Sequence, residues 1–404
     1  MIKRDFYLNR LKNFIDQPEI LKIIVGVRRC GKSVMLELIQ DELKKRGIKP
    51  ENFIKLNFEK MSLSELRNPE KLYAFLTEKI RRIKGRSFLF LDEVQEVEDW
   101  ERCINSLRVE TQADIYLTGS NAKLLAGEYA TLIGGRYVSL RLLPFSFREY
   151  LEAKREAAPD ISVRDAFRKY LIVGGMPFVT AYNLNENDAD SYLKDIYSSV
   201  VIKDIVQRNQ IRNVDLLERI LTYVFANIGS TFSANSISKY FLSEKRKAAP
   251  ETVLNYLKAA QEAYLIYKLD RFDVPSKRQL KVDEKYYIAD HGIREAIFGG
   301  NERDIERVLE NIVCLELLSR GYELRVGRVG DREVDFVCDN KGNRIYIQVS
   351  YLLAGEETIN REFGVYRNIG DNYPKYVVSM DEIDLSRDGI LHRNIREFLL
   401  STEY

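Results

Sequence analysis

Residues 20–43 read ILKIIVGVRRCGKSVMLELIQDEL, and this stretch decides the fold of the amino-terminal part of the chain. Its centre, GVRRCGKS at 26–33, has the GxxxxGKS spacing of a phosphate-binding loop. An apolar run precedes the loop at 20–25, and a helical pattern follows it at 34–43. A strand, a glycine-containing loop and a helix in this order predict a binding site for ATP or GTP.

The residue types in the loop fit the chemistry of phosphate binding. Gly26 and Gly31 allow the backbone to curl, so that successive N–H groups point at a β-phosphate beside a helix start that favours anions. We expect Lys32 between the β- and γ-phosphates and Ser33 on the Mg²⁺ ion that bridges them. The residues predicted to contact nucleotide are Gly26, Val27, Arg28, Arg29, Cys30, Gly31, Lys32, Ser33, Val34 and Ser120.

Some of these positions have a second interpretation. Gly-Lys-Ser also occurs by chance at a helix start. Arg28 and Arg29 either contact phosphate or form surface ion pairs. Cys30 is either a small residue at a variable loop position or a redox handle whose oxidation blocks nucleotide.

A second motif, FLFLDE at 88–93, is an apolar run that ends in two carboxylates, as in a Walker B strand. We expect Asp92 to hold Mg²⁺ and Glu93 to orient and deprotonate the attacking water. The alternative is a strand that simply ends at the surface. A third run, DIYLTGSN at 114–121, ends in small polar residues, where Ser120 or Asn121 is either a sensor of the γ-phosphate or part of an ordinary turn.

Charge that develops on the γ-phosphate needs a cation, and Arg136 in the motif GGRY is the candidate arginine finger, acting in cis or from a neighbouring chain. Glu59, after the apolar stretch 53–58, is either a second acid at the site or a solvated strand end. The predicted catalytic set is therefore Glu93, Lys32 and Arg136, with Ser33 and Asp92 as metal ligands and ATP and Mg²⁺ as cofactors.

Composition bounds the remaining possibilities. With 404 residues and 45% hydrophobic content, the chain is long enough for two or three globular domains. Its 63 basic and 61 acidic residues nearly cancel, so a nucleic-acid surface would have to be a local patch. Four scattered cysteines and two histidines support neither a zinc site nor a disulfide framework. No apolar run reaches the roughly 18–20 residues that span a bilayer, and a cytoplasmic protein is expected.

Three regions follow from the change of pattern along the chain. Apolar strands alternate with helical segments over 1–150, which predicts a parallel, doubly wound α/β sheet with nucleotide at the carboxyl ends of its strands. A helical region is expected at 151–275, and a separate α/β unit at 276–404.

The middle region contains the pattern of a winged helix. Helices are expected at 231–240 and 250–263, followed by an apolar wing at 264–269. A basic group surrounds the second helix and is either a contact for DNA phosphates or part of a surface that packs or binds a protein partner. Its members are Lys239, Lys245, Arg246, Lys247 and Lys258.

The last region has acids at the spacing of a PD-(D/E)xK nuclease-like core. Glu310, Glu333 and Asp335 supply acids, but the tripeptide that should read acid-x-Lys is Gln348-Val349-Ser350. An amide oxygen ligates Mg²⁺ more weakly than a carboxylate does. The possible nuclease-like site Glu310, Asp335 and Gln348 is therefore expected to be inactive or purely binding.

Taken in order with the motifs PFSFREYL, YLIVGGMP and GDREVDFV, the chain resembles bacterial and archaeal AAA-type ATPases with a C-terminal nuclease-like domain of unknown function. The resemblance covers nearly the full length. It implies an ATPase core, a winged-helix middle and a restriction-endonuclease-like end, and it marks Gly31, Lys32, Ser33, Asp92, Glu93 and Arg136 as site residues.

The function expected from these patterns is Mg²⁺-dependent ATP hydrolysis coupled to rearrangement of the two later modules on DNA. A homo-oligomer is a possible assembly of the chain. Two alternatives stay open. One is a slow nucleotide-dependent switch that holds a protein partner, and the other is a DNA nuclease regulated by ATP.

Overall fold

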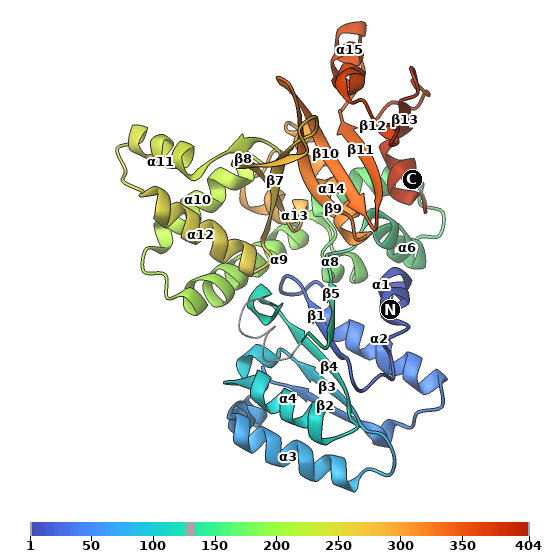
Figure 1. Ribbon diagram of the computed structural model, residues 1–404, viewed down its shortest axis with the longest axis vertical. Helices are drawn as coiled ribbons and strands as arrows, with labels where there is room; N and C mark the ends of the chain where they lie inside the picture. Colours follow the sequence, from blue (N-terminus) through green and yellow to red (C-terminus); the bar gives the residue numbers. More distant parts are fainter. Residues whose placement is uncertain (1, 126–134, 403–404) are drawn as a thin grey trace. The chain divides into compact units, whose positions relative to one another are not determined.

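The computed structural model describes residues 2–125 and 135–402, except for the side chains of 279–283, and falls into two compact units (Figure 1). Unit 1 comprises 1–142 with 262–264, and unit 2 comprises 143–261 with 265–404. The AAA-type region expected at 1–150 thus nearly coincides with unit 1. In the described residues, no helix has the length and apolar character needed to cross a membrane.

Unit 1 is built on a five-stranded sheet in the order β2-β3-β4-β1-β5. All four pairings are parallel, which confirms the predicted parallel α/β fold. Its central strands β3, β4 and β1 are buried throughout because helices cover both faces. The strands are β1 Leu21–Val25, β2 Phe53–Asn57, β3 Phe88–Asp92, β4 Asp114–Gly119 and β5 Tyr137–Arg141.

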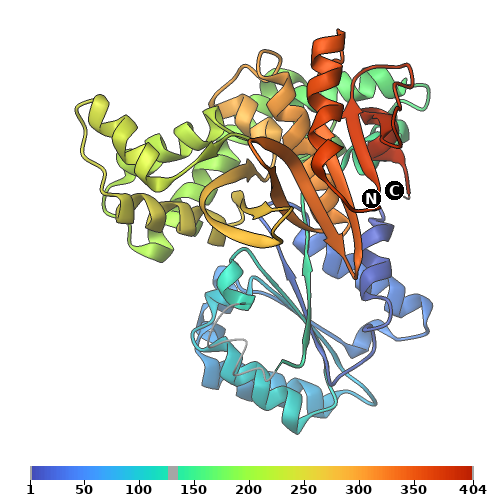
Figure 2. The same cartoon turned by 45° about the horizontal axis from the view of Figure 1, so that its top comes forward.

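The helices of unit 1 lie on opposite faces of this sheet. The chain moves from β1 outward to β2 and then back through β3 to β4, so right-handed crossovers place α2 on one face and α3 and α4 on the other (Figures 1 and 2). The helices are α1 Asp5–Leu11, α2 Lys32–Lys45, α3 Pro69–Arg82 and α4 Trp100–Glu110. The loops after β1, β3 and β4 therefore meet at the carboxyl edge of the sheet.

Unit 2 contains an eight-stranded mixed sheet in the order β13-β12-β11-β10-β9-β7-β8-β6. An apolar core that includes Val334, Val337, Tyr346 and Val377 lies beneath its later strands. The strands are β6 Thr231–Phe232, β7 Ile266–Asp273, β8 Arg278–Ile288, β9 Glu323–Val329, β10 Arg332–Asn340, β11 Asn343–Val349, β12 Lys375–Ser379 and β13 Leu391–Asn394.

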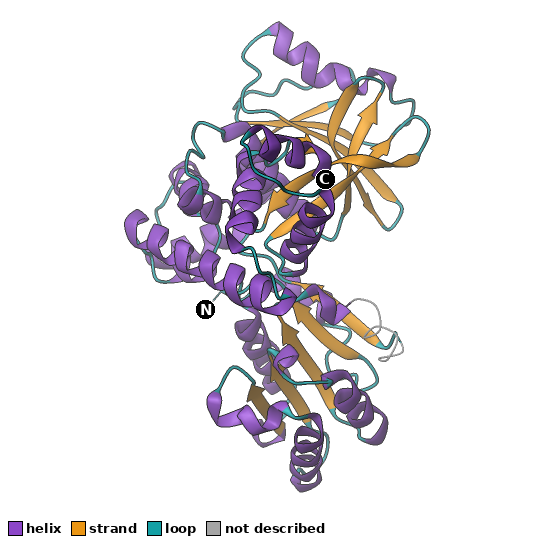
Figure 3. Ribbon diagram, turned by 90° about the vertical axis from the view of Figure 1, so that its left-hand side faces the viewer, coloured by secondary structure: helices purple, strands orange, loops and turns teal. Residues whose placement is uncertain are grey.

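Most of the helices of unit 2 gather to one side of its strands (Figure 3). Of the helices that the structure describes in this unit, nine precede the last three strands of the sheet, and α9 continues into a π-helix at Val200–Gln207. The helices are α6 Phe147–Ala157, α7 Val163–Val173, α8 Pro177–Ala181, α9 Glu186–Ser199, α10 Val214–Ala226, α11 Ala234–Ser243, α12 Pro250–Glu262, α13 His291–Ile297, α14 Ile305–Ser319, α15 Glu356–Gly364 and α16 Ile395–Leu400.

The middle region has the order α10, β6, α11, α12 and then the β7–β8 hairpin, with β6 paired to β8. The helix expected at 231–240 is corrected, because 231–232 form a strand and Ser233 caps α11 by accepting the N–H of Ser236 at 3.2 Å. The predicted boundary at 275 falls in the turn between β7 and β8 of one sheet. The three-domain division and the winged-helix and nuclease-like assignments stay predictions.

Candidate nucleotide site

The phosphate-binding loop connects β1 to α2 at the carboxyl edge of the unit 1 sheet. Gly26 has a φ of 157°, and a Cβ there would lie 2.2 Å from the carbonyl oxygen of Leu142. Gly31 has a φ of 102°, in the left-handed region, where it begins α2. Glycine is thus required at both ends of the loop, for close approach at the first and for backbone conformation at the second.

The two predicted metal ligands lie together. The Ser33 hydroxyl, in the first turn of α2, donates to Asp92 Oδ2 at 2.7 Å from the end of β3. The same Oδ2 accepts a bond from the side-chain amide of Asn57 at 2.8 Å. Burial raises the pKa of Asp92, although bonds from Thr118 and Ser33 act in the opposite direction. A hydroxyl and a carboxylate in contact at a loop of this shape are the donors that Mg²⁺ prefers.

The two predicted catalytic side chains are also in contact. Lys32 Nζ lies 3.3 Å from Glu93 Oε1, and both side chains are at least nine-tenths buried. The ammonium also donates to the carbonyl oxygens of Gly26 at 3.2 Å and Val27 at 3.3 Å. Burial raises the pKa of Glu93, but Lys32, Gln95 and Arg28 outweigh it and lower that pKa to about 2. Glu93 is therefore a carboxylate held by Lys32 at neutral pH.

Thr118, on β4, joins the two acids and was missed by the sequence analysis. Its hydroxyl donates to Asp92 Oδ1 and accepts the backbone N–H of Glu93 at 2.9 Å. The residue is fully buried. The sequence did contain a signal for Thr118, because this residue is the second-last of a strand that lies beside the Walker B strand. Adjacent parallel strands end at one edge of the sheet, so residues at their ends lie close together.

The remaining loop positions are occupied by protein contacts. Arg28 donates to Glu59 Oε1 at 2.6 Å, so these two predicted site residues form an ion pair. Arg29 has a φ of 68°, and Val34 is partly exposed at the start of α2. Ser120, at the end of β4, is fully buried.

Cys30 is not the redox handle considered above. It is fully buried, and its thiol donates to the carbonyl oxygen of Leu142 at 3.3 Å. Burial raises the pKa of this thiol, which keeps it protonated and unreactive. The carbonyl oxygen of Cys30 accepts a bond from Arg4 at 3.1 Å, so the residue serves the shape of the loop.

Arg136 lies away from this site in its own chain. Its carbonyl oxygen accepts the N–H of Leu21, the first residue of β1, whereas the loop follows the last residue, Val25. Five strand residues of about 3.3 Å each separate the two edges. This contradicts a finger that acts in cis, and action from a neighbouring chain stays a prediction. Gly134 of the motif GGRY lies outside the described residues.

The predicted site of unit 2 is brought together around a lysine. Glu310 on α14 and Asp335 on β10 lie 2.8 and 3.2 Å from the Nζ of Lys285 on β8. Gln348 on β11 accepts the backbone N–H of Asp335 through Oε1 at 3.1 Å. Lys285 was missed, since nothing in the local sequence relates β8 to α14 and β10.

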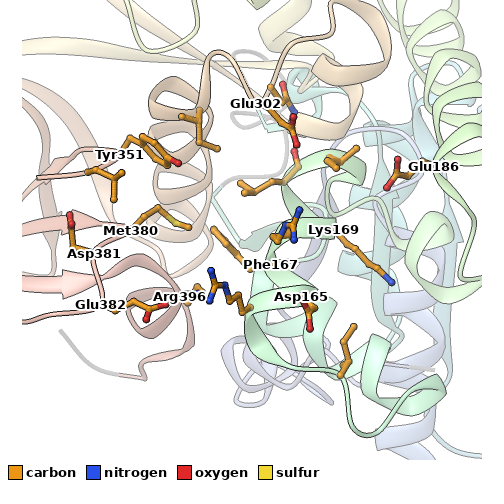
Figure 4. A pocket seen from close by; sticks show the side chains of 18 residues that line it. Asp165, Phe167, Lys169, Glu186, Glu302, Tyr351, Met380, Asp381, Glu382 and Arg396 are labelled. Carbon is orange, nitrogen blue, oxygen red and sulfur yellow. Dashed lines mark hydrogen bonds and ion pairs between the residues drawn. The ribbon is translucent and has the colours of Figure 1, made fainter. Parts of the chain in front are cut away.

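A separate cavity of about 1030 Å³ opens in unit 2 (Figure 4). Lys169 and Asp165 of α7 line one wall, and Met380 and Arg396 come from the opposite side. Tyr351, which follows β11, is 43% exposed at the rim. The cavity therefore offers apolar and charged groups together.

Comparisons with known proteins identify the family of the chain. Residues 19–151 match a family described as an AAA domain, and residues 164–304 match a domain of unknown function. An uncharacterised protein of Haemophilus influenzae is 35% identical over 94% of this chain and 93% of its own. An uncharacterised protein of Methanocaldococcus jannaschii is 31% identical over 86% of this chain and 78% of its own.

A solved structure shares the fold. The Walker-type ATPase from Pyrococcus abyssi superposes with a TM-score of 0.51 at 15% identity, over 74% of this chain and 96% of that one. Unit 1 thus has the fold of an AAA-type P-loop ATPase, with an additional mixed sheet and helices in unit 2.

Proposed function

Since the chain belongs to the family of AAA-domain proteins that includes these uncharacterised proteins of Haemophilus influenzae and Methanocaldococcus jannaschii, we propose that unit 1 binds and hydrolyses ATP with Mg²⁺. One observation carries the proposal. The Ser33 hydroxyl and Asp92 carboxylate are 2.7 Å apart, directly beside the Lys32–Glu93 pair and a loop shaped for phosphate. Ligands, cation and base thus meet at one edge of the sheet.

The roles follow from charge and position. Loop N–H groups and the start of α2 bind the phosphates. Ser33 and Asp92 fit a Mg²⁺ ion, which when bound supplies charge neutralisation at the phosphate oxygens. Lys32 moves from Glu93 to the phosphates, because their charge exceeds that of one carboxylate. Glu93, released from Lys32, accepts the proton of the attacking water.

We propose further that the nucleotide state of unit 1 controls unit 2 on DNA. The basic group of α11, α12 and their connection supports this proposal, because its side chains are exposed at positions suited to phosphate contacts. Exposed members include Lys239, Lys245 and Lys247, whereas Arg246 lies 3.3 Å from Asp215. The cavity beside Tyr351 and Leu352 favours the second candidate function, a nucleotide-dependent switch that holds a protein segment.

The test is Mg²⁺-dependent ATP hydrolysis by the full chain, with and without single-stranded DNA, double-stranded DNA or RNA. We expect Lys32→Ala to lose on the order of 10³-fold in turnover. Lys44→Ala is the matched control, because Lys44 is a surface residue of the same helix paired with Asp41. Turnover that survives Lys32→Ala would refute the site. Stimulation by DNA supports the DNA-coupled function, and Lys32-dependent turnover indifferent to nucleic acid supports the protein switch.

A further inference from the structure

Unit 2 holds a buried ammonium among three carboxylates. Lys285 Nζ lies 2.7 Å from Glu333 Oε1, 2.8 Å from Glu310 Oε1 and 3.2 Å from Asp335 Oδ1. Only 3% of the lysine side chain is exposed. Glu333 and Asp335 are two positions apart on β10, beside an irregularity in its pairing with β9, and both carboxylates reach the same ammonium.

The oxygens around this ammonium are engaged by further donors. Asp335 uses Oδ1 for Lys285 and Oδ2 for the backbone N–H of Val349 at 2.9 Å. Glu310 Oε1 also accepts the hydroxyl of Tyr287 at 2.6 Å. Packing fixes Glu310 in addition, because a Cβ on Gly229 would lie 2.6 Å from its Oε2. The carboxylates are therefore held in place by the protein itself.

Gln348 is also committed to the protein. Its Oε1 accepts the backbone N–H of Asp335, and its side chain hydrogen bonds to the carboxylate of Glu362. A carboxylate at position 348 would meet Glu362 and Asp335 as like charges. The amide is thus the residue type that the surroundings favour.

Charge balance requires a cation at this point. An isolated buried carboxylate is strongly unfavourable, and the two buried ones, Glu310 and Asp335, are tolerated together only with a compensating positive charge, which the half-buried Glu333 also contacts. Burial lowers the pKa of Lys285, but Glu310, Asp335 and Glu333 outweigh it and raise that pKa well above its usual value. In the described residues, no three acids, histidines or cysteines are arranged to hold a metal ion.

We propose that Lys285 is the resident cation of this carboxylate cluster and occupies the position that a divalent metal ion would take. The wild-type cluster is therefore closed to metal ions and does not support metal-dependent cleavage of nucleic acid. Removal of the ammonium opens a site for an oxygen-preferring divalent cation such as Mn²⁺. The lysine, more than the altered tripeptide, distinguishes this unit from a metal-dependent nuclease.

The experiment compares thermal unfolding of nucleotide-free wild type and Lys285→Met with and without MnCl₂. We expect Lys285→Met to unfold at a lower temperature and to recover at least half of that loss in millimolar MnCl₂. Wild type should shift by less than a degree or two. Lys268→Met is the matched control, because Lys268 lies between Asp270 and Glu284 on the neighbouring strand but is more exposed. Its Mn²⁺ response should equal that of wild type.

A double variant locates the cation. Asp335→Asn added to Lys285→Met should abolish the recovery, because one ligand is lost. A folded Lys285→Met protein that ignores Mn²⁺ would overturn the proposal. Where that variant does not fold, equilibrium dialysis of wild type and of Asp335→Asn against Mn²⁺ decides. Mn²⁺ binding by wild type that Asp335→Asn removes would show an open metal site and refute the proposal. The absence of such binding supports the proposal.

Discussion

Lys32 and Glu93 form a buried ion pair. Their charges are 3.3 Å apart and buried, so the ammonium stabilises the carboxylate and the carboxylate positions the ammonium above the loop. A carboxylate with a pKa near 2 is a weak base. If Lys32 binds phosphate as proposed, we expect the basicity of Glu93 to rise, which would couple substrate binding to activation of water.

Glu93→Gln tests this coupling. We expect ATP affinity to change by less than about threefold, whereas turnover falls on the order of 10²- to 10⁴-fold because the general base is lost. Equilibrium ATP binding and steady-state hydrolysis measure the two quantities. Glu59→Gln is the control, since Glu59 is paired with Arg28 and 46% exposed. Loss of turnover in Glu59→Gln alone would assign the base to Glu59 instead.

Single residues were predictable where a local motif fixes their role. Ser33 and Asp92 belong to short patterns with defined chemistry, and the structure brings them into contact. Thr118 and Lys285 belong to no such pattern, because their partners are 26 and 25 or more positions away. Arg136 directly precedes β5, and its place at the amino end of this parallel strand argues against a finger that acts in cis.

At the scale of elements, two glycines explain why the segment around 174 packs against α13. A Cβ on Gly174 would lie 2.2 Å from Asp290 Oδ1, and one on Gly175 would lie 2.1 Å from the carbonyl oxygen of Phe145. Asp290 caps α13 and also accepts the N–H of Gly175 at 2.7 Å. The specific motifs PFSFREYL and YLIVGGMP are therefore structural, since they close this junction within unit 2.

His291, in the first turn of α13, makes this junction sensitive to acid. Its Nε2 donates to the carbonyl oxygen of Tyr170 at 2.6 Å, and its Nδ1 has no hydrogen-bond partner in the described part of the chain. Burial lowers the pKa of His291 to about 4 from the usual 6.5, and Arg294 acts in the same direction. The folded protein therefore keeps the imidazole neutral where the unfolded chain binds a proton.

The sign of the pH effect follows. As the pH falls from 6.5 toward 4, the unfolded chain binds a proton at His291 and the folded chain does not. The stability that the neutral imidazole contributes is therefore complete above pH 6.5 and is lost over this range. We expect the free energy of unfolding to fall by up to about 1.4 kcal/mol per pH unit from this residue. Urea unfolding from pH 4.5 to 7.5 measures it. His291→Gln should flatten that dependence, whereas an unchanged slope in this variant would exclude His291.

Elements with long periodic patterns were predicted well. The strands of unit 1 and the helices α2 and α12 lie within a few residues of the expected ranges, because hydrophobic periodicity and caps are local signals. The two-residue strand β6 was missed, since its pairing with β8 depends on residues more than 50 positions away. Likewise, the single sheet that joins β6 to β13 is set by tertiary pairing.

At the scale of the whole molecule, the position of Arg136 bears on assembly. This exposed residue lies at the amino end of β1, at the edge of the sheet opposite the phosphate-binding loop. An arginine finger at this place reaches a γ-phosphate only on another copy of the chain. We therefore propose that complete sites form between chains, in which one copy supplies the loop and the next supplies Arg136.

Mixing two inactive variants tests this assembly. Arg136→Ala retains its loop and Lys32→Ala retains its finger, so an equimolar mixture regains turnover at the sites where the intact loop meets the intact finger. For a random dimer, about a quarter of all sites are then complete. Specific activity of wild type should also rise with enzyme concentration. The control mixture contains Lys32→Ala and Arg164→Ala, in which an exposed arginine of α7 is replaced instead of Arg136. Full activity of Arg136→Ala alone would contradict an arginine finger at this position. A mixture that is no more active than its two components would contradict a site shared between chains.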